Sequence, residues 1–344
     1  MDKAPYPAGL LPEDISRAYG LDKAYRGLQV FKWIVKGARS FADMTDFPAA
    51  ERERLAALLP SLYSSSVDGS LGDPDGSIKL KIRLGDGAAV ESVLLCDHEG
   101  RLTACLSSQV GCPMACAFCK TGTLGFLRNL ETHEIVEQYL HLSAIRGRIQ
   151  NVVYMGMGEP LLNLAAVRSS IAILTHPDGF GLSKRKITLS TCGLVPGILD
   201  LAQNGPHVRL AISLTAADER IRNELMPVNK TWNLAALKDA LLVYQKASGD
   251  RITLETALMA GTNAGVDSAR AVAAWARGLK VQVNVIPWNP VDGLPYHEPS
   301  RAEVSAYENE LERLGLTAVR RARRGRGVAG ACGQLGDTLK ADQD

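Results

Sequence analysis

The sequence lacks the features that mark membrane and secreted proteins. It has no run of about 18 apolar residues, so we expect no membrane-spanning helix and no membrane partner. The segment from Met1 to Pro5 has no basic stretch followed by an apolar one, so we expect no secretory signal and a cytoplasmic location. Internal repeats and low-complexity stretches are also missing. The apolar share of 46% and the charged share of 22% are ordinary for a globular protein.

The number of cysteines is odd, whereas a scaffold held by disulfides would use an even number. The seven cysteines stand at positions 96, 105, 112, 116, 119, 192 and 332. An odd number in a chain expected in the cytosol argues against a disulfide framework. Metal ligation or redox chemistry is the better interpretation, with Cys96 and Cys192 read as packing residues.

Neither sign of charge dominates. Lys and Arg number 39 and Asp and Glu 37, a net charge of +2 that neither demands nor excludes nucleic acid. The distribution is more informative, because five arginines fall between positions 320 and 326. Such a cluster can neutralise phosphates or simply solvate a loop, and charge alone favours neither. The cluster comprises Arg320, Arg321, Arg323, Arg324 and Arg326.

From position 103 onward, short β-rich runs alternate with amphipathic stretches. Alternation of this kind predicts βαβ units, a parallel sheet and a full or partial barrel. In such barrels the site lies at the carboxyl ends of the strands. The expected strands are 103–107, 151–155, 186–191, 208–214, 252–259, 281–286 and 317–321. The expected helices are 132–146, 164–174, 195–204, 234–248, 268–278 and 301–314.

The first hundred residues have a different pattern. Short helices are expected at 12–19, 24–36 and 49–59, and a turn-rich stretch at 67–76 then leads to a hairpin of strands 78–84 and 89–95. We therefore predict three parts. They are a helical accessory domain at 1–70, a β-hairpin extension or linker at 71–101, and a core at 102–344.

Three cysteines at 112, 116 and 119 have the spacing C-x3-C-x2-C and follow the first core strand. Three thiolates can ligate three irons of a [4Fe–4S] cluster, and the fourth iron stays open to chelate S-adenosylmethionine. Electron transfer into the sulfonium then gives a 5′-deoxyadenosyl radical. The alternative is structural zinc, which needs four ligands, but no paired C-x2-C or H-x3-H follows. The spacing favours the cluster.

Residues after the later strands extend this site. Gly158 and Glu159 follow the second strand, where glycine permits close approach of a ligand and the carboxylate can accept from an ammonium. Ser190, Ser213, Thr215 and Asn289 stand at or after other strand ends, where they suit ribose, carboxylate and adenine contacts. Taken singly, each is as readily a cap or turn residue.

Several ordered segments stand along the chain. They are FKWI at 31–34, SFADMT at 40–45, CLSSQVGC at 105–112, the cysteine triplet, GFLRNL at 125–130, MGMGEPLLN at 155–163, IPWNP at 286–290 and ACGQL at 331–335. Together they resemble the RlmN/Cfr family of radical S-adenosylmethionine RNA adenine methyltransferases, and the resemblance spans nearly the whole chain. It implies an α/β fold, a partial (β/α)6 radical-SAM barrel with a small helical N-terminal domain that binds RNA.

The resemblance also implies roles. Cys332 would be methylated by a first S-adenosylmethionine, and a radical from a second would activate that methyl group for transfer to adenine. Glu91 would remove the ring proton, and Cys105 would attack the sulfur of Cys332 and release the base. The cluster ligands would be Cys112, Cys116 and Cys119. The S-adenosylmethionine contacts would be Gly158, Glu159, Ser190, Ser213, Leu214, Thr215 and Asn289.

The residues leave room for other interpretations of these groups. Cys105 could be a buried strand cysteine and Glu91 a solvated hairpin carboxylate, whereas Cys332 lies in a Gly-rich segment where a mobile thiol is expected. The chain also departs from the family where Thr215 replaces a common histidine and Cys192 a common serine. Its segment before Cys332 has more arginine and less acid than expected.

The implied substrate is C2 of an adenosine in 23S rRNA, and the sequence leaves open whether tRNA is a second substrate. Alternatives are methylation at C8, a radical enzyme acting on a small molecule, and a zinc-stabilised RNA-binding protein without catalysis. We further expect a reductant such as flavodoxin or ferredoxin and a monomeric chain.

Overall fold

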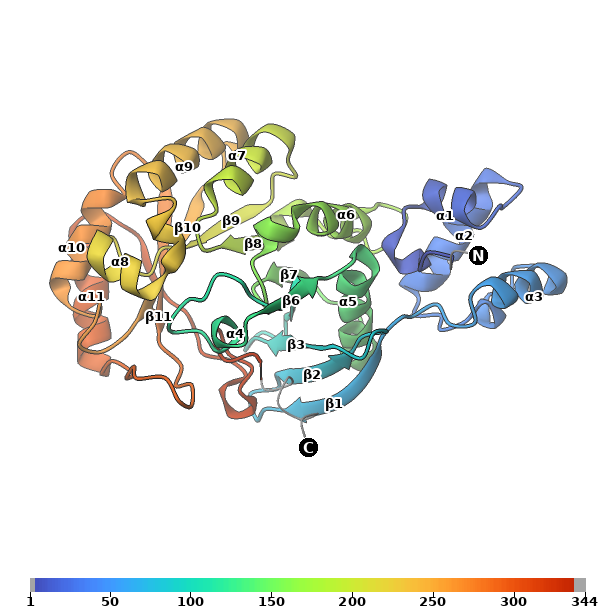
Figure 1. Cartoon of the computed structure of the whole chain (residues 1–344), viewed down its shortest axis with the longest axis horizontal. Coiled ribbons are helices and arrows are strands. Elements are labelled where there is room, and N and C mark those ends of the chain that lie inside the picture. Colours follow the sequence, from blue (N-terminus) through green and yellow to red (C-terminus); the bar gives the residue numbers. More distant parts are fainter. Residues whose placement is uncertain (1–3, 337–344) are drawn as a thin grey trace.

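Seven parallel strands form the centre of the molecule in the computed structural model, which describes residues 4–336 (Figure 1). Each pairs in register with the next, so their carboxyl ends gather at one edge. The expected core strands are confirmed. They are β4 (Leu102–Cys105), β7 (Asn151–Tyr154), β8 (Ile187–Thr191), β9 (Arg209–Ser213), β10 (Ile252–Leu258), β11 (Val281–Pro287) and β12 (Ala318–Arg320).

Helices connect successive strands and cover the outer face of the sheet (Figure 1). Their boundaries follow local capping: Asn233 accepts from the Ala236 N–H at the start of α9 (Leu234–Ser248), and Ser300 and Glu303 form a capping box at the start of α11 (Arg301–Arg313). Within residues 4–336 this makes six strand–helix units and a last strand, the predicted partial (β/α)6 barrel. The helices are α5 (Thr132–Arg146), α6 (Leu164–Thr175), α7 (Val195–Asn204), α9 (Leu234–Ser248), α10 (Val266–Trp275) and α11 (Arg301–Arg313).

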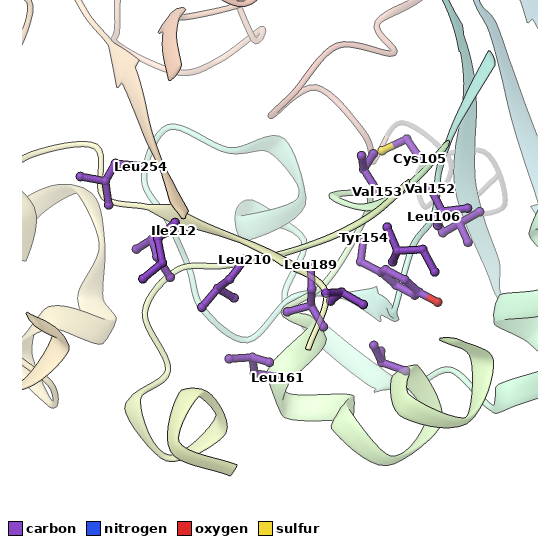
Figure 2. Packing of buried hydrophobic residues seen from close by; sticks show 14 of the residues in the cluster. Cys105, Leu106, Val152, Val153, Tyr154, Leu161, Leu189, Leu210, Ile212 and Leu254 are labelled. Atoms are coloured by element: carbon purple, nitrogen blue, oxygen red, sulfur yellow. The ribbon is translucent and has the colours of Figure 1, made fainter. Parts of the chain in front are cut away.

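The barrel core is built from strand residues that are buried on both faces of the sheet (Figure 2). Tyr154, Leu189 and Ile212 are fully buried there, and Leu161 joins them from the loop after β7. A buried side chain of this size contributes about 1.5–3 kcal/mol. Two-sided burial explains why these strands read as apolar runs rather than as alternating patterns.

Three antiparallel strands extend the sheet beyond β4. The predicted hairpin is confirmed as β2 (Ile78–Arg83) and β3 (Ala89–Cys96). The stretch at 67–76 was expected to be turn-rich, and the turn at 73–76 is there, but β1 (Ser66–Gly72), which the sequence did not indicate, precedes it and pairs with β2. β1 is exposed along almost its whole length, so it lacks the alternation that identifies a strand from sequence.

Four short elements near the site were not anticipated from the sequence. They are too brief to show a periodicity of their own. They are β5 (Gln109–Gly111), α4 (Lys120–Thr123), β6 (Phe126–Asn129) and α8 (Glu219–Leu225).

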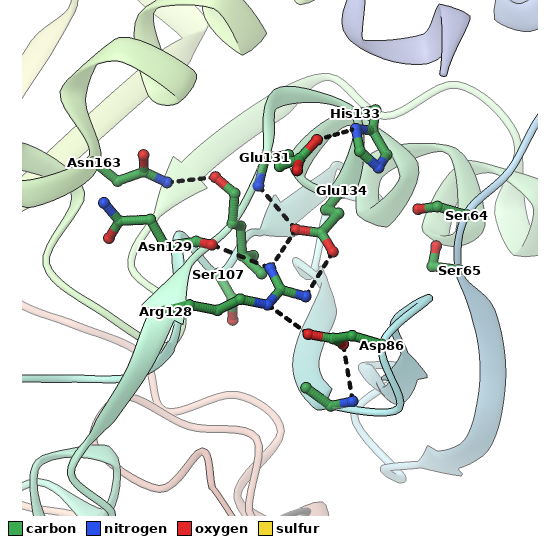
Figure 3. A network of polar contacts seen from close by, with 12 residues as sticks. Ser64, Ser65, Asp86, Ser107, Arg128, Asn129, Glu131, His133, Glu134 and Asn163 are labelled. Carbon is green, nitrogen blue, oxygen red and sulfur yellow. Dashed lines mark hydrogen bonds and ion pairs between the residues drawn. The ribbon is translucent and has the colours of Figure 1, made fainter. Parts of the chain in front are cut away.

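A polar network ties β6 to the hairpin and to α5 (Figure 3). Arg128 donates to Asp86 in the β2–β3 turn at 2.7 Å and binds Glu134 of α5 with two contacts of 2.8 Å. These carboxylates raise the pKa of Arg128, and the guanidinium lowers that of Asp86. The network fixes the strand that runs beside the cysteine triplet.

The expected N-terminal helices are confirmed and lie to one side of the barrel (Figure 1). They have a core of their own around Phe31, Phe41 and Met44, which α5 completes through Val136 and Leu140. The proposed domain limits at residues 70 and 101 stay a prediction. No helix among residues 4–336 is both long and apolar enough to cross a membrane. The three N-terminal helices are α1 (Pro12–Ala18), α2 (Ala24–Val35) and α3 (Ala49–Leu58).

Candidate active site

One cavity lies at the carboxyl ends of the strands and contains most of the predicted site. Its empty space, including the open solvent at its mouth, is about 1090 Å³. Leu214, Glu91 and Cys105 do not line it. The predicted residues that do are Cys112, Cys116, Cys119, Gly158, Glu159, Ser190, Ser213, Thr215, Asn289 and Cys332.

The cysteine loop is held in place by backbone contacts. The Cys112 N–H donates to the Gly125 carbonyl at 2.7 Å, and the Ala117 N–H to the Leu225 carbonyl at 2.9 Å. Ala115 has a φ of +49°, a left-handed turn that lets the chain reverse between the first two thiols. All three thiols therefore face one cavity although they stand on an irregular loop.

The three cysteines in this cavity supply thiolate ligands, the kind that hold a [4Fe–4S] cluster. Burial raises the pKa of Cys112 to about 12 and also raises those of Cys116 and Cys119, so a bound cation is needed to keep the thiolates deprotonated. Among the described residues, no three His, Cys, Asp or Glu side chains are grouped closely enough to hold one ion. A cubane instead distributes its thiolates over separate irons.

The loop after β7 requires its glycine at position 158. Gly158 has a φ of +100°, and a Cβ there would lie 2.6 Å from the Cβ of Gln109. The next residue, Glu159, accepts from the Leu161 N–H at 3.0 Å and from the Cys192 N–H at 2.8 Å. Burial raises the pKa of Glu159, although these two N–H groups and the side chains of Cys192 and Thr191, which hydrogen-bond to the carboxylate, act to lower it.

Two predicted site residues directly follow β9: Leu214 lies outside the cavity, and Thr215 lines it with a strained backbone. Thr215 lines the cavity with a φ of +60°, which is uncommon for a β-branched residue and costs about 1–3 kcal/mol. Leu214 is fully buried in the barrel core, and its carbonyl accepts from Arg222 at 3.0 Å. Only its main chain is therefore near the site.

Asn289 carries an unsatisfied acceptor at the cavity wall. Its Nδ2 donates to the Cys332 carbonyl at 3.1 Å, and its buried Oδ1 has no partner within residues 4–336. Buried polar atoms are normally hydrogen-bonded, so a free acceptor here fits a ligand with an N–H donor, as adenine and an ammonium group have. The residues present thus suit S-adenosylmethionine as well as the cluster.

A second cavity adjoins the first, and Cys332 lines both. Cys105, at the end of β4, lines only the second (its place beside the core is seen in Figure 2). Burial, and then the nearby Cys332, raise the pKa of the Cys105 thiol to about 12. Arg321 lies beside both thiols and pairs with Glu255 at 2.9 Å. Glu255 was not predicted as a site residue. It lies on β10, far from Arg321 in the chain, and the sequence does not show which distant residues form ion pairs.

Hydrogen bonds to α4 hold the segment with Cys332 in this structure, and the mobile thiol expected from its glycines stays a prediction. The Lys120 N–H donates to the Gly333 carbonyl at 2.8 Å, and the Thr121 hydroxyl to the Leu335 carbonyl at 2.6 Å. The two donors belong to α4, directly after the cysteine triplet. The anchoring places Cys332 next to the cluster loop.

Glu91 is buried rather than solvated, because β3 is covered on both faces. Its Oε1 pairs with Lys79 at 3.2 Å, and its Oε2 accepts from the Gly336 N–H at 2.7 Å. The carboxylate lines neither cavity in this structure but contacts the segment that carries Cys332. Lys79 was missed in the sequence because a lysine on a hairpin is usually exposed.

The arginine cluster is less available to phosphates than its sequence indicates. Arg320 pairs with Glu308, and Arg321 with Glu255. Arg323 and Arg326 share Glu298. Within residues 4–336, Arg324 alone of the five makes no ion pair. The acidic partners come from other segments of the chain, so the local composition could not reveal them.

Comparison with known proteins agrees with this geometry. The model of the radical SAM superfamily, whose members use a [4Fe–4S] cluster and S-adenosylmethionine, matches residues 106–267, which confirms both predicted cofactors. The chain is 49% identical over 331 residues to the probable dual-specificity RNA methyltransferase RlmN of Treponema pallidum, covering 96% of this chain and 97% of the relative. The RlmN of Moorella thermoacetica is 44% identical, covering 95% and 96%.

Among solved structures, a radical SAM methyltransferase from Sphaerobacter thermophilus superposes with a TM-score of 0.90 and 36% identity. The match covers 95% of this chain and 98% of that protein. The fold, the cavity and both comparisons agree over nearly the full length. The chain belongs to the RlmN family of radical SAM RNA methyltransferases.

Proposed function

We propose that this protein methylates C2 of an adenosine in 23S rRNA, and in tRNA, through a methylated Cys332. One observation carries the proposal: Cys332 lies on the wall shared by the two cavities. A thiol in that place can receive a methyl group from one side and deliver it on the other. Relatives described as dual-specificity RNA methyltransferases support RNA as the acceptor.

The first cavity would hold the cofactors. The thiolates of Cys112, Cys116 and Cys119 would ligate three irons and leave the fourth for S-adenosylmethionine. When bound, the reduced cluster supplies the electron that cleaves S-adenosylmethionine to a 5′-deoxyadenosyl radical. The proposed S-adenosylmethionine contacts are Gly158, Glu159, Ser190, Ser213, Thr215, Asn289 and the main chain of Leu214.

Cys332 would carry the one-carbon unit. Its thiolate attacks the methyl carbon of a first S-adenosylmethionine and releases S-adenosylhomocysteine, so one turnover uses two molecules of the cofactor. After loss of a hydrogen atom from the S-methyl group, the methylene radical on Cys332 adds to the adenine carbon. This route is needed because a C–H carbon of electron-poor adenine is a weak nucleophile for direct methyl transfer.

Glu91 and Cys105 would complete the reaction. Glu91 accepts the ring proton, which requires the Gly336 N–H to leave its Oε2 as the Cys332 segment moves. The Cys105 thiolate attacks the sulfur of Cys332, the unpaired electron of the adduct would pass to the oxidised cluster, and the released carbon takes up a proton to give the methylated base. The resulting disulfide is then reduced by an external thiol. We place this activity in the cytoplasm, in a monomer that receives electrons from flavodoxin or ferredoxin.

Two mass-spectrometric measurements test the proposal. Protein purified from cells should contain methylated Cys332, which would be unmodified in a radical enzyme acting on a small molecule. 23S rRNA from a deletion strain complemented with this gene should contain 2-methyladenosine. Complementation with Cys332→Ala should yield none, whereas Cys96→Ala, at a cysteine that lines neither cavity, should behave as the wild type. Finding only 8-methyladenosine would overturn the C2 assignment.

A further inference from the structure

The second cavity reaches the opposite end of the barrel from the cofactor cavity. Cys105 and Cys332 line its inner part. Its outer part is lined by residues at the amino ends of three neighbouring strands: Asn151 begins β7, Lys186 directly precedes β8 and Arg209 begins β9. The cavity therefore runs from the amino ends of the strands to the two thiols.

This cavity carries an excess of positive charge. Lys186 and Arg209 are exposed, Arg324 is half-buried, and within residues 4–336 none of the three side chains has an ion-pair partner. The carboxylate on the described lining is Asp97, which Arg101 and backbone N–H groups satisfy, so that its pKa falls to about 2. Three cations thus face the cavity without a compensating carboxylate.

We propose that this cavity is the RNA entrance, in which Lys186, Arg209 and Arg324 bind the phosphates that flank the target adenosine. The proposal rests on the function given above and adds which face of the barrel the RNA meets. Enzymes that modify a base inside a folded nucleic acid extrude it into a pocket, and a cationic groove holds the adjoining backbone. Here the pocket ends at the thiols that would deliver the methyl group.

The uncharged lining agrees with a nucleotide rather than a small anion. Thr103, Asn151 and Thr188 add hydroxyl and amide groups to the lining of the same cavity. A ribose and a base present donors and acceptors over a comparable stretch, whereas an inorganic anion would need only the rim. S-adenosylmethionine and RNA would then approach Cys332 from different cavities and not compete for space.

Charge reversal at the rim tests the entrance. Lys186→Glu and Arg209→Glu alter exposed side chains, so the fold should persist, and cluster content and Cys332 methylation report that each variant is loaded. Lys184→Glu is the matched control, because it makes the same charge change two residues away and outside the cavity. Binding of a 23S rRNA fragment containing the target adenosine is titrated at several salt concentrations.

The double variant should bind the fragment at least tenfold more weakly at about 150 mM salt. Its logarithmic salt slope should fall by about 1.5, because each lost phosphate contact removes about 0.7–0.9. Lys184→Glu should match the wild type. Equal RNA binding by the double variant and the wild type would overturn the proposed entrance. So would a loss of RNA affinity in Lys184→Glu as large as that in the double variant. Absence of methylated adenine with the wild-type protein would instead refute the proposed function, so the two failures are distinguishable.

Discussion

The buried ion pair between Lys79 and Glu91 allows a quantitative prediction. The two side chains lie 3.2 Å apart and are 6% and 3% exposed. At an effective dielectric constant of about 20, their attraction is about 5 kcal/mol. Lys79→Met removes the cation and leaves a buried carboxylate unpaired, which typically costs about 3–5 kcal/mol. We expect the free energy of unfolding to fall by that amount.

The measurement is a urea titration followed by circular dichroism under anaerobic conditions. Lys81→Met is the matched control, because Lys81 lies on the same strand and pairs with Asp68 at 3.5 Å near the surface. A pair of that kind contributes about 0–1 kcal/mol. The double variant Lys79→Met with Glu91→Leu should regain most of the lost stability, since no charge is then left buried.

Function should separate from stability in the same variants. Lys79→Met should lose RNA methylation under conditions in which it is still folded, because the proposed base loses the cation that holds its carboxylate. Methylation of Cys332, which does not involve Glu91, should persist. A Lys79→Met variant within about 1 kcal/mol of the wild type, or no less stable than Lys81→Met, would refute the reasoning.

Three further predictions concern other parts of the molecule. Cys105→Ala should trap a covalent protein–RNA adduct on a denaturing gel, because the sulfur of Cys332 can no longer be attacked; a clean turnover without adduct would contradict its role. Gly158→Ala should weaken S-adenosylmethionine binding at least tenfold in equilibrium dialysis, since its Cβ would lie 2.6 Å from that of Gln109; wild-type affinity would show that the loop relaxes. Burial raises the pKa of Glu137 from 4.5 to about 7, so the folded state binds the extra proton and stability should fall by up to about 3 kcal/mol as pH rises from 4.5 to 7. Glu137→Gln should flatten that profile in urea titrations at each pH, and an already flat wild-type profile would be inconsistent with this burial.

The core helices and the longer core strands could be predicted because each shows its own pattern, and the short strands β4, β7 and β12 could be predicted because they alternate with those helices. Helix α5, for example, was predicted with the limits that the structure shows. Strand β1 was missed because both its faces are exposed, so no apolar residue marks its inner side. The short elements β5, β6 and α4 contain four residues or fewer, and their geometry follows from the contacts around them.

The sequence alone determined the chemistry available to this protein. The spacing of Cys112, Cys116 and Cys119, together with ordered motifs along the chain, indicated the cluster and the family, because covalent spacing is a property of the chain itself. The resemblance also indicated Glu91, Cys105 and Cys332, whose assigned roles remain proposals.

Only the tertiary structure decided how those groups meet. It buried Glu91 against Lys79, paired Arg321 with Glu255, and placed Cys332 between two cavities. Each of these contacts joins residues that are separated in the chain. Burial and charge pairing depend on which segments pack together in space, and a local pattern of residues does not contain that information.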